Sequence, residues 1–513
     1  MFTFASTAFC KTYYIDALKG NDSNNGLSAT TAWQTVSKVS RFSFKPGDII
    51  SFRAGQIFKG ILNISSGGKP GMPVTYTSYG SGVQPVIDGN GDSTAVYCYN
   101  KEYINLQNIA ICNFRQGEIK MNDLFNGIYI VNEDAAVLHH FHFDHIRVFN
   151  VNSSIIAKDE GKTDQSRFHG GVQFRTIGNK IRSNFDDVLI TDCIFENLSR
   201  TGFNFRSDWD DRSAYSKFGD AIGKGLTDNW TPNTGVIFRK NHFKNIAANG
   251  LIVRVAVNAL IEYNVFDSCG TKISGNAVFN FNTDNAVYQF NECMHTIYNE
   301  GDTDARGIDS DYRTKHTIIQ YNYLHDNGLG GITATGGPGT GSDPVNFNIG
   351  TIIRYNIIEN NARQGVYFSG RIMGLKMYNN IIYADTDYND VIAIKLNRWV
   401  TFPDSAEFSN NIFYFKGKNI SWAFTSSTNN VFEKNIYYGI KPPTEFNDPS
   451  AITQDPLLNL SGKGTIRYRL LKGSPALHAG VLIDKNAEHD YYGNKINKKE
   501  MINIGIDNGN PKK

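Results

Sequence analysis

The chain has 513 residues, of which 40% are hydrophobic and 19% are charged, with 51 lysines and arginines against 49 aspartates and glutamates. This near-neutral balance argues against a nucleic-acid binder or a membrane-surface binder, which usually carries a basic stripe or tail. No stretch of 18 consecutive apolar residues is present to span a membrane. Phe and Tyr are abundant, at 34 and 26 residues, and with many Gly and Asn residues they favour strands and tight turns over helices.

The N-terminal segment MFTFASTAFCK, residues 1–11, is predicted to be the remnant of a secretory signal peptide. It is apolar and rich in small residues, and it turns polar at Lys11, although the usual basic start is missing. A short buried first strand is the alternative interpretation. Export would make the protein secreted or periplasmic. The six cysteines are scattered without a C-x-x-C pair, so neither a zinc site nor a disulfide framework is expected.

The next segment, TAWQTVSKVS, has the pattern of a short amphipathic helix. A helix at this place would cover the open edge of the first strands and prevent edge-to-edge pairing. Two stretches that follow, YINLQNIAICNF and FDHIRVFNV, are weak versions of a pattern that dominates the rest of the chain.

That pattern is a β-branched or aromatic strand, then usually an Asn, then a second short apolar strand, as in IIQYNYL, IIRYNII and EFSNNIF. Successive Asn residues lie 23, 27, 31, 34, 24, 31 and 24 positions apart. A floor of 23 to 24 residues with variable excess is typical of three-strand coils with loop insertions. We expect each Asn to adopt left-handed turn geometry and to bond the Asn of the next coil. The recurring positions are Asn241, Asn264, Asn291, Asn322, Asn356, Asn380, Asn411 and Asn435.

A third strand, often opened by Gly, follows each of these phrases, as in GITATG and GVYFSG. Coils of three strands stack about 4.8 Å apart, so each strand type forms one parallel sheet. The sequence therefore predicts an all-β fold, a right-handed parallel β-helix over residues 12–440, with residues 441–513 as a C-terminal cap. A β-sandwich is the alternative, but it does not explain why the Asn phrase and the Gly-led strand alternate in fixed order.

A binding groove is predicted beside the sheet of Gly-led strands, because the longest insertions flank it. Strand alternation turns Ile308 and Ser310 inward and leaves Asp309 and Asp311 outward. An outward column of polar side chains suits a sugar chain, although an ordinary solvated sheet face is also polar. In the same register, the residues expected to face outward are Asn204, Arg206, Arg254, Asn280, Asn282, Thr333, Thr335, Tyr367, Ser369, Lys395 and Asn397. Of these we expect Arg206, Arg254, Asn280 and Lys395 to bind substrate.

The densest chemical signal is NEGDTDARGIDSDYRTKH, which holds five acidic residues within twelve positions. Asp309 and Asp311 lie on one face of one strand, about 6.6 Å apart along it. Glycosidases need such a pair, one carboxyl as acid and the other ionised, but the spacing is too coarse to choose between inversion and retention.

Two other interpretations of this acidic segment stay open. Calcium could bind Asp302, Asp304 and the more distant Asp284, although no EF-hand spacing demands it. A lyase could use calcium or Arg254 to neutralise a uronate, with Lys395 or an arginine taking the proton. Alternatively, the carboxylates form surface salt bridges with Arg306, Arg313 and Lys315.

His325 precedes a Gly-led strand one coil after the acidic segment. We expect it to reach the groove and contact substrate as an acid or base, with a simple turn histidine as the alternative.

Both ends of the chain carry further recognisable stretches: YYIDALKGNDSNNGLSATTAW, KPGDIISFRAGQIFKG, GMPVTYTSYG and PVIDGNG near the start, and SPALHAG, DYYGN and INIGIDNG near the end. In these and in its repeats the chain resembles a large family of secreted bacterial right-handed parallel β-helix proteins, many of them polysaccharide-degrading enzymes. The resemblance implies the fold, whereas the chemistry depends on the site because this family hosts several activities.

Taken together, the sequence predicts an exported glycoside hydrolase that cleaves a polysaccharide, which the basic groove residues allow to be acidic. Asp309 and Asp311 are its predicted catalytic pair. A polysaccharide lyase acting on a uronate-containing glycan is one alternative, and a non-catalytic glycan-binding solenoid is another.

Overall fold

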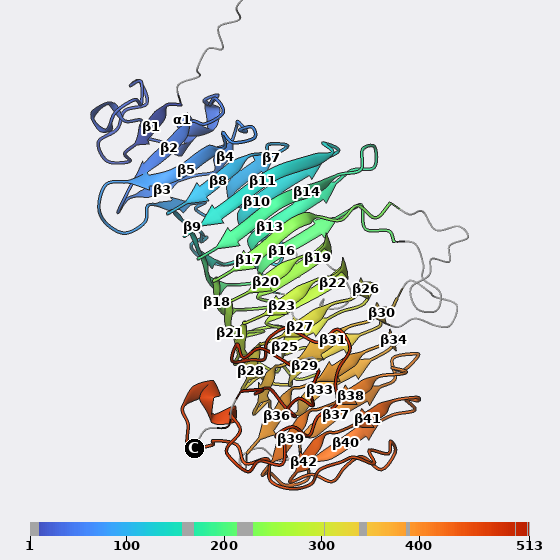
Figure 1. Ribbon diagram of the computed structural model, residues 1–513. Helices are drawn as coiled ribbons and strands as arrows, with labels where there is room; N and C mark the ends of the chain where they lie inside the picture. The colour runs from blue at the N-terminus through green and yellow to red at the C-terminus, as the bar shows by residue number, and fades with distance from the viewer. Residues whose placement is uncertain are drawn as a thin grey trace, which may run out of the picture. The chain divides into compact units, whose positions relative to one another are not determined.

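The chain folds as a right-handed parallel β-helix, as the sequence predicts (Figure 1). The computed structural model describes residues 10–155, 169–212, 229–301, 303–337, 346–385, 390–497, 499–509 and 511. Two compact units divide the chain: unit 1 comprises Met1–Trp209 and Thr231–His242, and unit 2 comprises Asp210–Trp230 and Phe243–Lys513. Each unit is built from three parallel sheets, A, B and C, to which successive strands contribute in turn.

Within unit 1 the successive strands of each sheet pair in parallel, coil by coil. Sheet A contains β1 (Thr12–Ile15), β2 (Ile49–Arg53), β5 (Val74–Tyr79), β8 (Ile104–Gln107), β11 (Val137–Asp144), β14 (Asn184–Thr191) and β17 (Thr234–Arg239). Sheet B contains β3 (Ile57–Lys59), β6 (Val86–Asp88), β9 (Ala110–Asn113), β12 (Arg147–Val151) and β15 (Ile194–Leu198). Sheet C contains β4 (Leu62–Ile64), β7 (Thr94–Tyr99), β10 (Asn126–Glu133), β13 (Gly170–Ile177) and β16 (Thr201–Ser207).

Unit 2 repeats the same three-strand coil with shorter strands. Sheet A contains β20 (Leu260–Glu262), β23 (Val287–Gln289), β27 (Ile318–Gln320), β31 (Ile352–Arg354), β35 (Lys376–Tyr378), β38 (Glu407–Ser409) and β41 (Val431–Glu433). Sheet B contains β18 (His242–Ile246), β21 (Val265–Cys269), β24 (Glu292–Met294), β28 (Tyr323–His325), β32 (Ile357–Glu359), β36 (Ile381–Ala384), β39 (Ile412–Phe415) and β42 (Ile436–Tyr438). Sheet C contains β19 (Leu251–Val257), β22 (Val278–Asp284), β25 (Arg306–Ser310), β29 (Gly330–Thr335), β33 (Gln364–Ser369), β37 (Ile392–Asn397) and β40 (Ser421–Phe424), with the short β26 (Thr314–Lys315), β30 (Asn348–Ile349) and β34 (Ile372–Met373) at its side.

The predicted capping helix is α1 (Val36–Arg41), preceded by the 3-10 turn η1 (Ala29–Thr31). The side chain of Thr35 caps α1 by accepting a hydrogen bond from the Lys38 N–H. Val36 and Val39 are buried, so the apolar face of the helix covers the first strands, as its pattern predicts.

The recurring Asn residues form a continuous buried ladder in unit 2. In each rung the backbone N–H and the side-chain amide of one Asn both donate to Oδ1 of the next, for example from Asn291 to Asn322 at 3.0 and 2.9 Å. The left-handed geometry expected of these residues lies one position earlier, at residues such as Tyr263 and Phe290, both with φ of 56°. The chain turns the corner at that earlier residue, so the backbone N–H and the side-chain amide of the Asn both point to the Asn of the next coil.

The leading Gly of the third strand also has a physical cause. A Cβ on Gly307 would lie 2.5 Å from Leu324 Cδ2, and one on Gly331 would lie 2.6 Å from Ile358 Cγ2. These contacts are with core side chains of sheet B, so a side chain at this corner would overpack the core. The recurring Gly is therefore a packing requirement of the corner between sheets B and C.

The segment after β42 does more than close the last coil. Its Asp448 accepts from the side-chain amide of Asn435 at 3.2 Å and so ends the Asn ladder. The chain then runs back along earlier coils, where the carbonyl of His489 accepts from the Tyr321 hydroxyl at 2.8 Å. One further 3-10 helix, η5 (Gly464–Tyr468), lies in this segment, which packs on a shared core of tyrosine and isoleucine side chains.

The cysteines and helices agree with the composition. All six cysteines are free, and five of them are buried. None of the helices in the described part of the chain has the length and apolar character needed to traverse a bilayer.

Candidate functional site

The candidate site is the outer face of sheet C in unit 2, where the acidic segment enters the sheet. Ile308 is fully buried and registers with the core residues Val278 and Ile332, so the next residue of β25, Asp309, belongs to the outward column. This column continues in register through Thr333, Tyr367 and Lys395 on the following coils.

Asp309 is held in a shielded position on this face. Asp309 is only 6% exposed, and its Oδ2 accepts a hydrogen bond from the side-chain amide of Asn276 at 3.1 Å. A buried carboxyl group must be protonated or well compensated, which suits an acid at a reaction centre.

Asp311 directly follows β25 and lies beside a second column of registered residues on sheet C, which begins at Thr335. Its Oδ1 accepts from the Thr335 hydroxyl at 2.5 Å and from the backbone N–H of Tyr312 at 2.8 Å. Thr335 registers with Ser369, and Ser369 registers with Asn397. Two hydrogen bonds to one oxygen stabilise the ionised carboxylate.

Aromatic and basic groups lie on the same sheet as this pair. The Tyr367 ring lies 4.5 Å from the guanidinium carbon of Arg306 and 5.5 Å from Lys395 Nζ. Arg306 also donates to Gln364 Oε1 at 2.9 Å. The Asn397 amide donates to the Tyr367 hydroxyl at 3.0 Å. Tyr367, an outward residue of the predicted groove, and Arg306, a predicted salt-bridge partner of the acidic segment, thus join the candidate site.

Arg254 lies on the neighbouring strand β19, where its guanidinium carbon lies 5.3 Å from the centre of the Phe281 ring. The residue is 8% exposed, so it is more enclosed than a solvated surface arginine. Its predicted contact with substrate stays a prediction.

Asn280 does not lie on the outer face. It registers with the inward Ser310, is fully buried, and donates to the hydroxyl groups of Thr283 and Thr317 at 2.7 and 3.2 Å. The prediction of an outward Asn280 is wrong because Val278 faces the core, which turns Phe279 out and Asn280 in.

The described metal candidates, Asp284 and Asp304, have other partners than the predicted catalytic pair. Both Asp284 oxygens accept from Arg212 Nη2 at 2.6 Å, and the guanidinium carbon of Arg212 lies 4.1 Å from the centre of the Trp230 ring. Asp304 accepts from the Ser274 hydroxyl at 2.8 Å, and Asp302 lies outside the described residues. Within the described ranges, the clusters of three metal-ligating side chains include none of these residues.

Comparison with known proteins agrees with this architecture. No known protein-family model matches the chain. The chain is 23% identical to a lacto-N-biosidase of Bifidobacterium longum subsp. longum, in an alignment covering 96% of this chain and 36% of that protein. The chain therefore spans about a third of the length of this curated relative.

Solved structures with a similar fold include the following two. The GH136 lacto-N-biosidase from Eubacterium ramulus has 18% identity and a TM-score of 0.62, with 80% of this chain and 68% of that chain covered. XylC in complex with xylose has 10% identity and a TM-score of 0.52, with 98% and 99% covered. These likenesses show the fold.

Arg206 lies in unit 1, on the outer face of sheet C in that unit. It registers with Arg175, whose guanidinium pairs with Asp208 at 2.5 Å. The same sheet carries a hollow of about 620 Å³ over β7 and β10, where the rings of Tyr97 and Tyr129 lie 6.0 Å apart. No sequence motif marked this hollow, because its two tyrosines come from separate coils.

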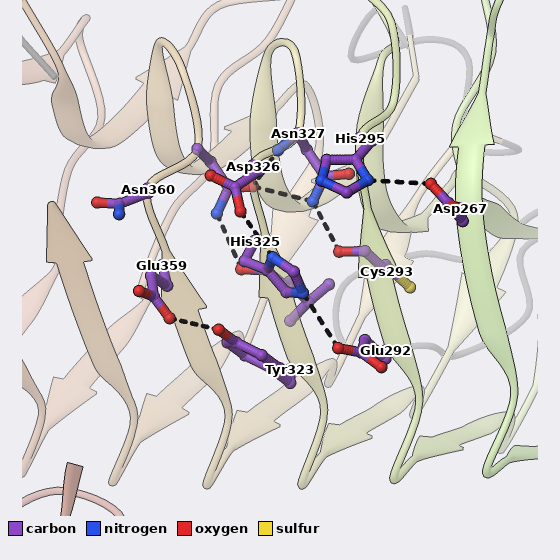
Figure 2. Close-up of polar contacts among 12 residues, drawn as sticks. Asp267, Glu292, Cys293, His295, Tyr323, His325, Asp326, Asn327, Glu359 and Asn360 are labelled. Carbon is purple, nitrogen blue, oxygen red and sulfur yellow. Dashed lines mark hydrogen bonds and ion pairs between the residues drawn. The ribbon is translucent and has the colours of Figure 1, made fainter. Parts of the chain in front are cut away.

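His325 is not on sheet C but is the last residue of β28 in sheet B. Figure 2 shows it between two carboxylates, with Nε2 at 3.2 Å from Glu292 and Nδ1 at 2.8 Å from Asp326. The ring of Tyr323 stacks on it at 4.1 Å, and the Tyr323 hydroxyl donates to Glu359 at 2.5 Å. The prediction that His325 reaches the groove beside the Gly-led strands is wrong, since the chain turns the corner only after this residue.

The ion pairs of His325 should make the free energy of unfolding depend on pH. Burial alone would lower the pKa of His325, but hydrogen bonds to Asp326 and Glu292 outweigh it and raise the pKa to about 9. The folded pKa thus exceeds the ordinary value of about 6.5. The ion pairs therefore stabilise the fold fully below about pH 6.5, and this stabilisation is lost as the pH rises through about 9.

We expect His325→Gln to lower the unfolding free energy by about 2 kcal/mol at pH 6 and by little at pH 9.5. The loss at pH 6 stays this small because solvent around Asp326 weakens its ion pair with the histidine. Urea unfolding of both proteins at the two pH values measures this difference. An equal loss at both pH values would mean that the histidine contributes packing and no charge.

Proposed function

We propose that the chain is a glycoside hydrolase that binds a glycan on the outer face of sheet C in unit 2 and uses Asp309 and Asp311 as its carboxyl pair. The observation that carries the proposal is the placement of these two carboxyls. One is nearly buried beside an amide donor, and the other accepts two hydrogen bonds at one oxygen. The likeness to a lacto-N-biosidase over 96% of the chain supports it.

In this mechanism Asp309, shielded from water, donates its proton to the glycosidic oxygen as the bond to the anomeric carbon breaks. Asp311 is ionised and faces the same patch, so it either attacks the anomeric carbon or removes a proton from the attacking water. Water adds to the anomeric carbon in both cases. In retention its proton returns to Asp309, whereas in inversion its proton passes to Asp311, and exchange with solvent then returns both carboxyls to their starting states. Thr335 and the Tyr312 N–H act as positioning groups for Asp311.

Tyr367 is the proposed platform for a sugar ring. Arg306 and Lys395 both lie near this ring and supply hydrogen-bond donors to hydroxyl or carboxylate groups. Lacto-N-biosyl glycosides are the first substrates to test because of the likeness to lacto-N-biosidases, and acidic polysaccharides are the second because of the two cations. We also propose that the protein acts outside the cytoplasm, on the character of residues 1–11.

Incubation of the intact protein with these substrates tests the proposal. A hydrolase yields new reducing ends and no unsaturated product. Proton NMR of the first product anomer then tells retention from inversion. An unsaturated, ultraviolet-absorbing product would instead establish a lyase that uses the cations around Tyr367. Binding without any product across the panel would establish a glycan-binding solenoid and overturn the enzymatic proposal.

A further inference from the structure

A separate cluster of histidines and aspartates lies on the outer face of sheet A in unit 1. It is formed by HHFHF of β11 and NFDDV of β14, strands that pair in parallel on successive coils (Figure 1). Their register passes from His139↔Asp186 directly to Phe141↔Val188 without a shift, so His140 and Asp187 form matched kinks at one place in the two strands. Both residues have left-handed backbones, with φ of 63° and 57°.

These matched kinks bring three potential metal ligands together. His140 Nδ1 lies 2.8 Å from Asp187 Oδ2, and His142 Nε2 lies 2.8 Å from Asp187 Oδ1. The two imidazole rings lie 3.7 Å apart, centre to centre. One donor atom from each residue falls within 4.8 Å of the others. Tetrahedral coordination at 2.0–2.2 Å needs donor atoms about 3.3 Å apart, so small side-chain rotations suffice.

Neighbouring side chains orient these ligands by hydrogen bonding and ring stacking, as the residues behind the ligands do in metal proteins. His140 Nε2 lies 3.1 Å from Asn105 Oδ1 on β8, and the ring of Tyr103 stacks on His140 at 5.7 Å. A fixed partner on the second ring nitrogen sets the tautomer that leaves Nδ1 free to ligate. The adjacent Asp186 is committed elsewhere, since it accepts from the Thr234 hydroxyl at 2.5 Å and contacts His139 at 3.0 Å.

Charge and access also favour a cation here. In the part of the chain that the structure describes, no Lys or Arg lies within 4.0 Å of the Asp187 carboxylate, and its ion-pair partners are imidazoles that carry charge only when protonated. The side chains of His140, His142 and Asp187 are 21%, 27% and 49% exposed. An ion can therefore enter from solvent, and a water molecule can complete its coordination.

We propose that His140, His142 and Asp187 bind one divalent transition-metal ion of the Zn²⁺ class, with a fourth position open to water. Two imidazole nitrogens and one carboxylate form the donor set that such ions prefer over Ca²⁺ or Mg²⁺. The ion joins β11 to β14 and so ties two successive coils together. This site is independent of the proposed glycan hydrolysis on unit 2.

Titration of untagged, chelator-treated protein with Zn²⁺ alone, followed by calorimetry, tests the proposal. We expect one equivalent to bind at the site, and Co²⁺ to give the visible absorption of a tetrahedral nitrogen and oxygen site. His142→Gln and Asp187→Asn should abolish this equivalent. Asn105→Ala, which removes only the partner of His140 Nε2, should weaken it about 10- to 100-fold.

The matched control is His145→Gln, which alters the second cluster of unit 1, formed by Asp144, His145 and Asp192. Zn²⁺ affinity should be unchanged in this variant. Circular dichroism in chelator shows whether each variant is folded, so lost binding is not confused with misfolding. No stoichiometric binding by the wild type, or equal binding by Asp187→Asn, would overturn the proposal, as would loss of binding in His145→Gln alone.

Discussion

Replacement of Asp309 by asparagine is expected to lower kcat/KM for glycan hydrolysis about 10²- to 10⁴-fold, the usual contribution of general acid catalysis. The amide keeps the size of the carboxyl and its contact with Asn276, but it has no acidic proton for the leaving oxygen. Binding should change little, because an amide of the same size keeps the shape of the patch. A substrate with a leaving group that needs no protonation should recover most of the lost rate.

Asp311→Asn should lower the rate by a similar factor, but a better leaving group should not rescue it. Asp267→Asn is the matched control, since Asp267 lies on sheet B of the same unit and pairs with His295 at 3.0 Å. This control should keep full activity. Steady-state kinetics on the three variants separate the roles of the two carboxyls. Full activity in Asp309→Asn would show that another residue of the acidic segment is the acid.

The fold was predictable because its two strongest determinants are local in sequence. The Asn ladder requires one Asn per coil at a fixed place in the strand pattern, and the corner between sheets B and C requires a residue without Cβ at positions such as Gly307 and Gly331. Both requirements recur with each coil, so the sequence repeats them. Each repeat therefore indicates the same coil geometry independently of the others.

The site was predictable only where strand alternation was regular. Alternation along β25 places Asp309 outward. On β22 the predicted alternation is out of phase by one residue, so Asn280 is predicted outward although it faces inward. His325 was assigned to the wrong sheet because the pattern does not show at which residue the chain turns the corner. Contacts across coils, such as that between Arg306 and Gln364, join residues 58 positions apart and leave no local signal.

The histidine cluster of β11 also escaped prediction. Its sequence, HHFHFDH, is conspicuous, but a regular strand would place His140 and His142 on one face without any carboxylate beside them. The matching kink in β14, 47 residues later, supplies Asp187. The left-handed residues of two separate strands must coincide for the cluster to form, and the sequence of one strand does not indicate the kink in the other.

Asn356→Ala, which removes one interior rung of the ladder, is expected to cost about 4 kcal/mol of unfolding free energy. Asn356 Oδ1 accepts from both the N–H and the side-chain amide of Asn322, and its own amide donates to the carbonyl of Ile319 at 2.9 Å and to Asn380 Oδ1 at 3.0 Å. All of these groups are fully buried. Each orphaned group costs about 1–3 kcal/mol when water cannot replace its partner.

Urea unfolding of this variant, compared with that of the exposed control Asn447→Ala, measures the loss. Asn447 lies at the surface of the C-terminal segment, so its truncation should stay within about 0.5 kcal/mol of wild type. The ladder bonds form only between stacked coils, so the two neighbouring rungs should lose strength together. Amide hydrogen exchange at Asn322 and Asn380 should then rise in Asn356→Ala and not in the control. A loss confined to position 356, with its neighbours still protected, would mean that the rungs act independently and that the ladder is a row of separate turns.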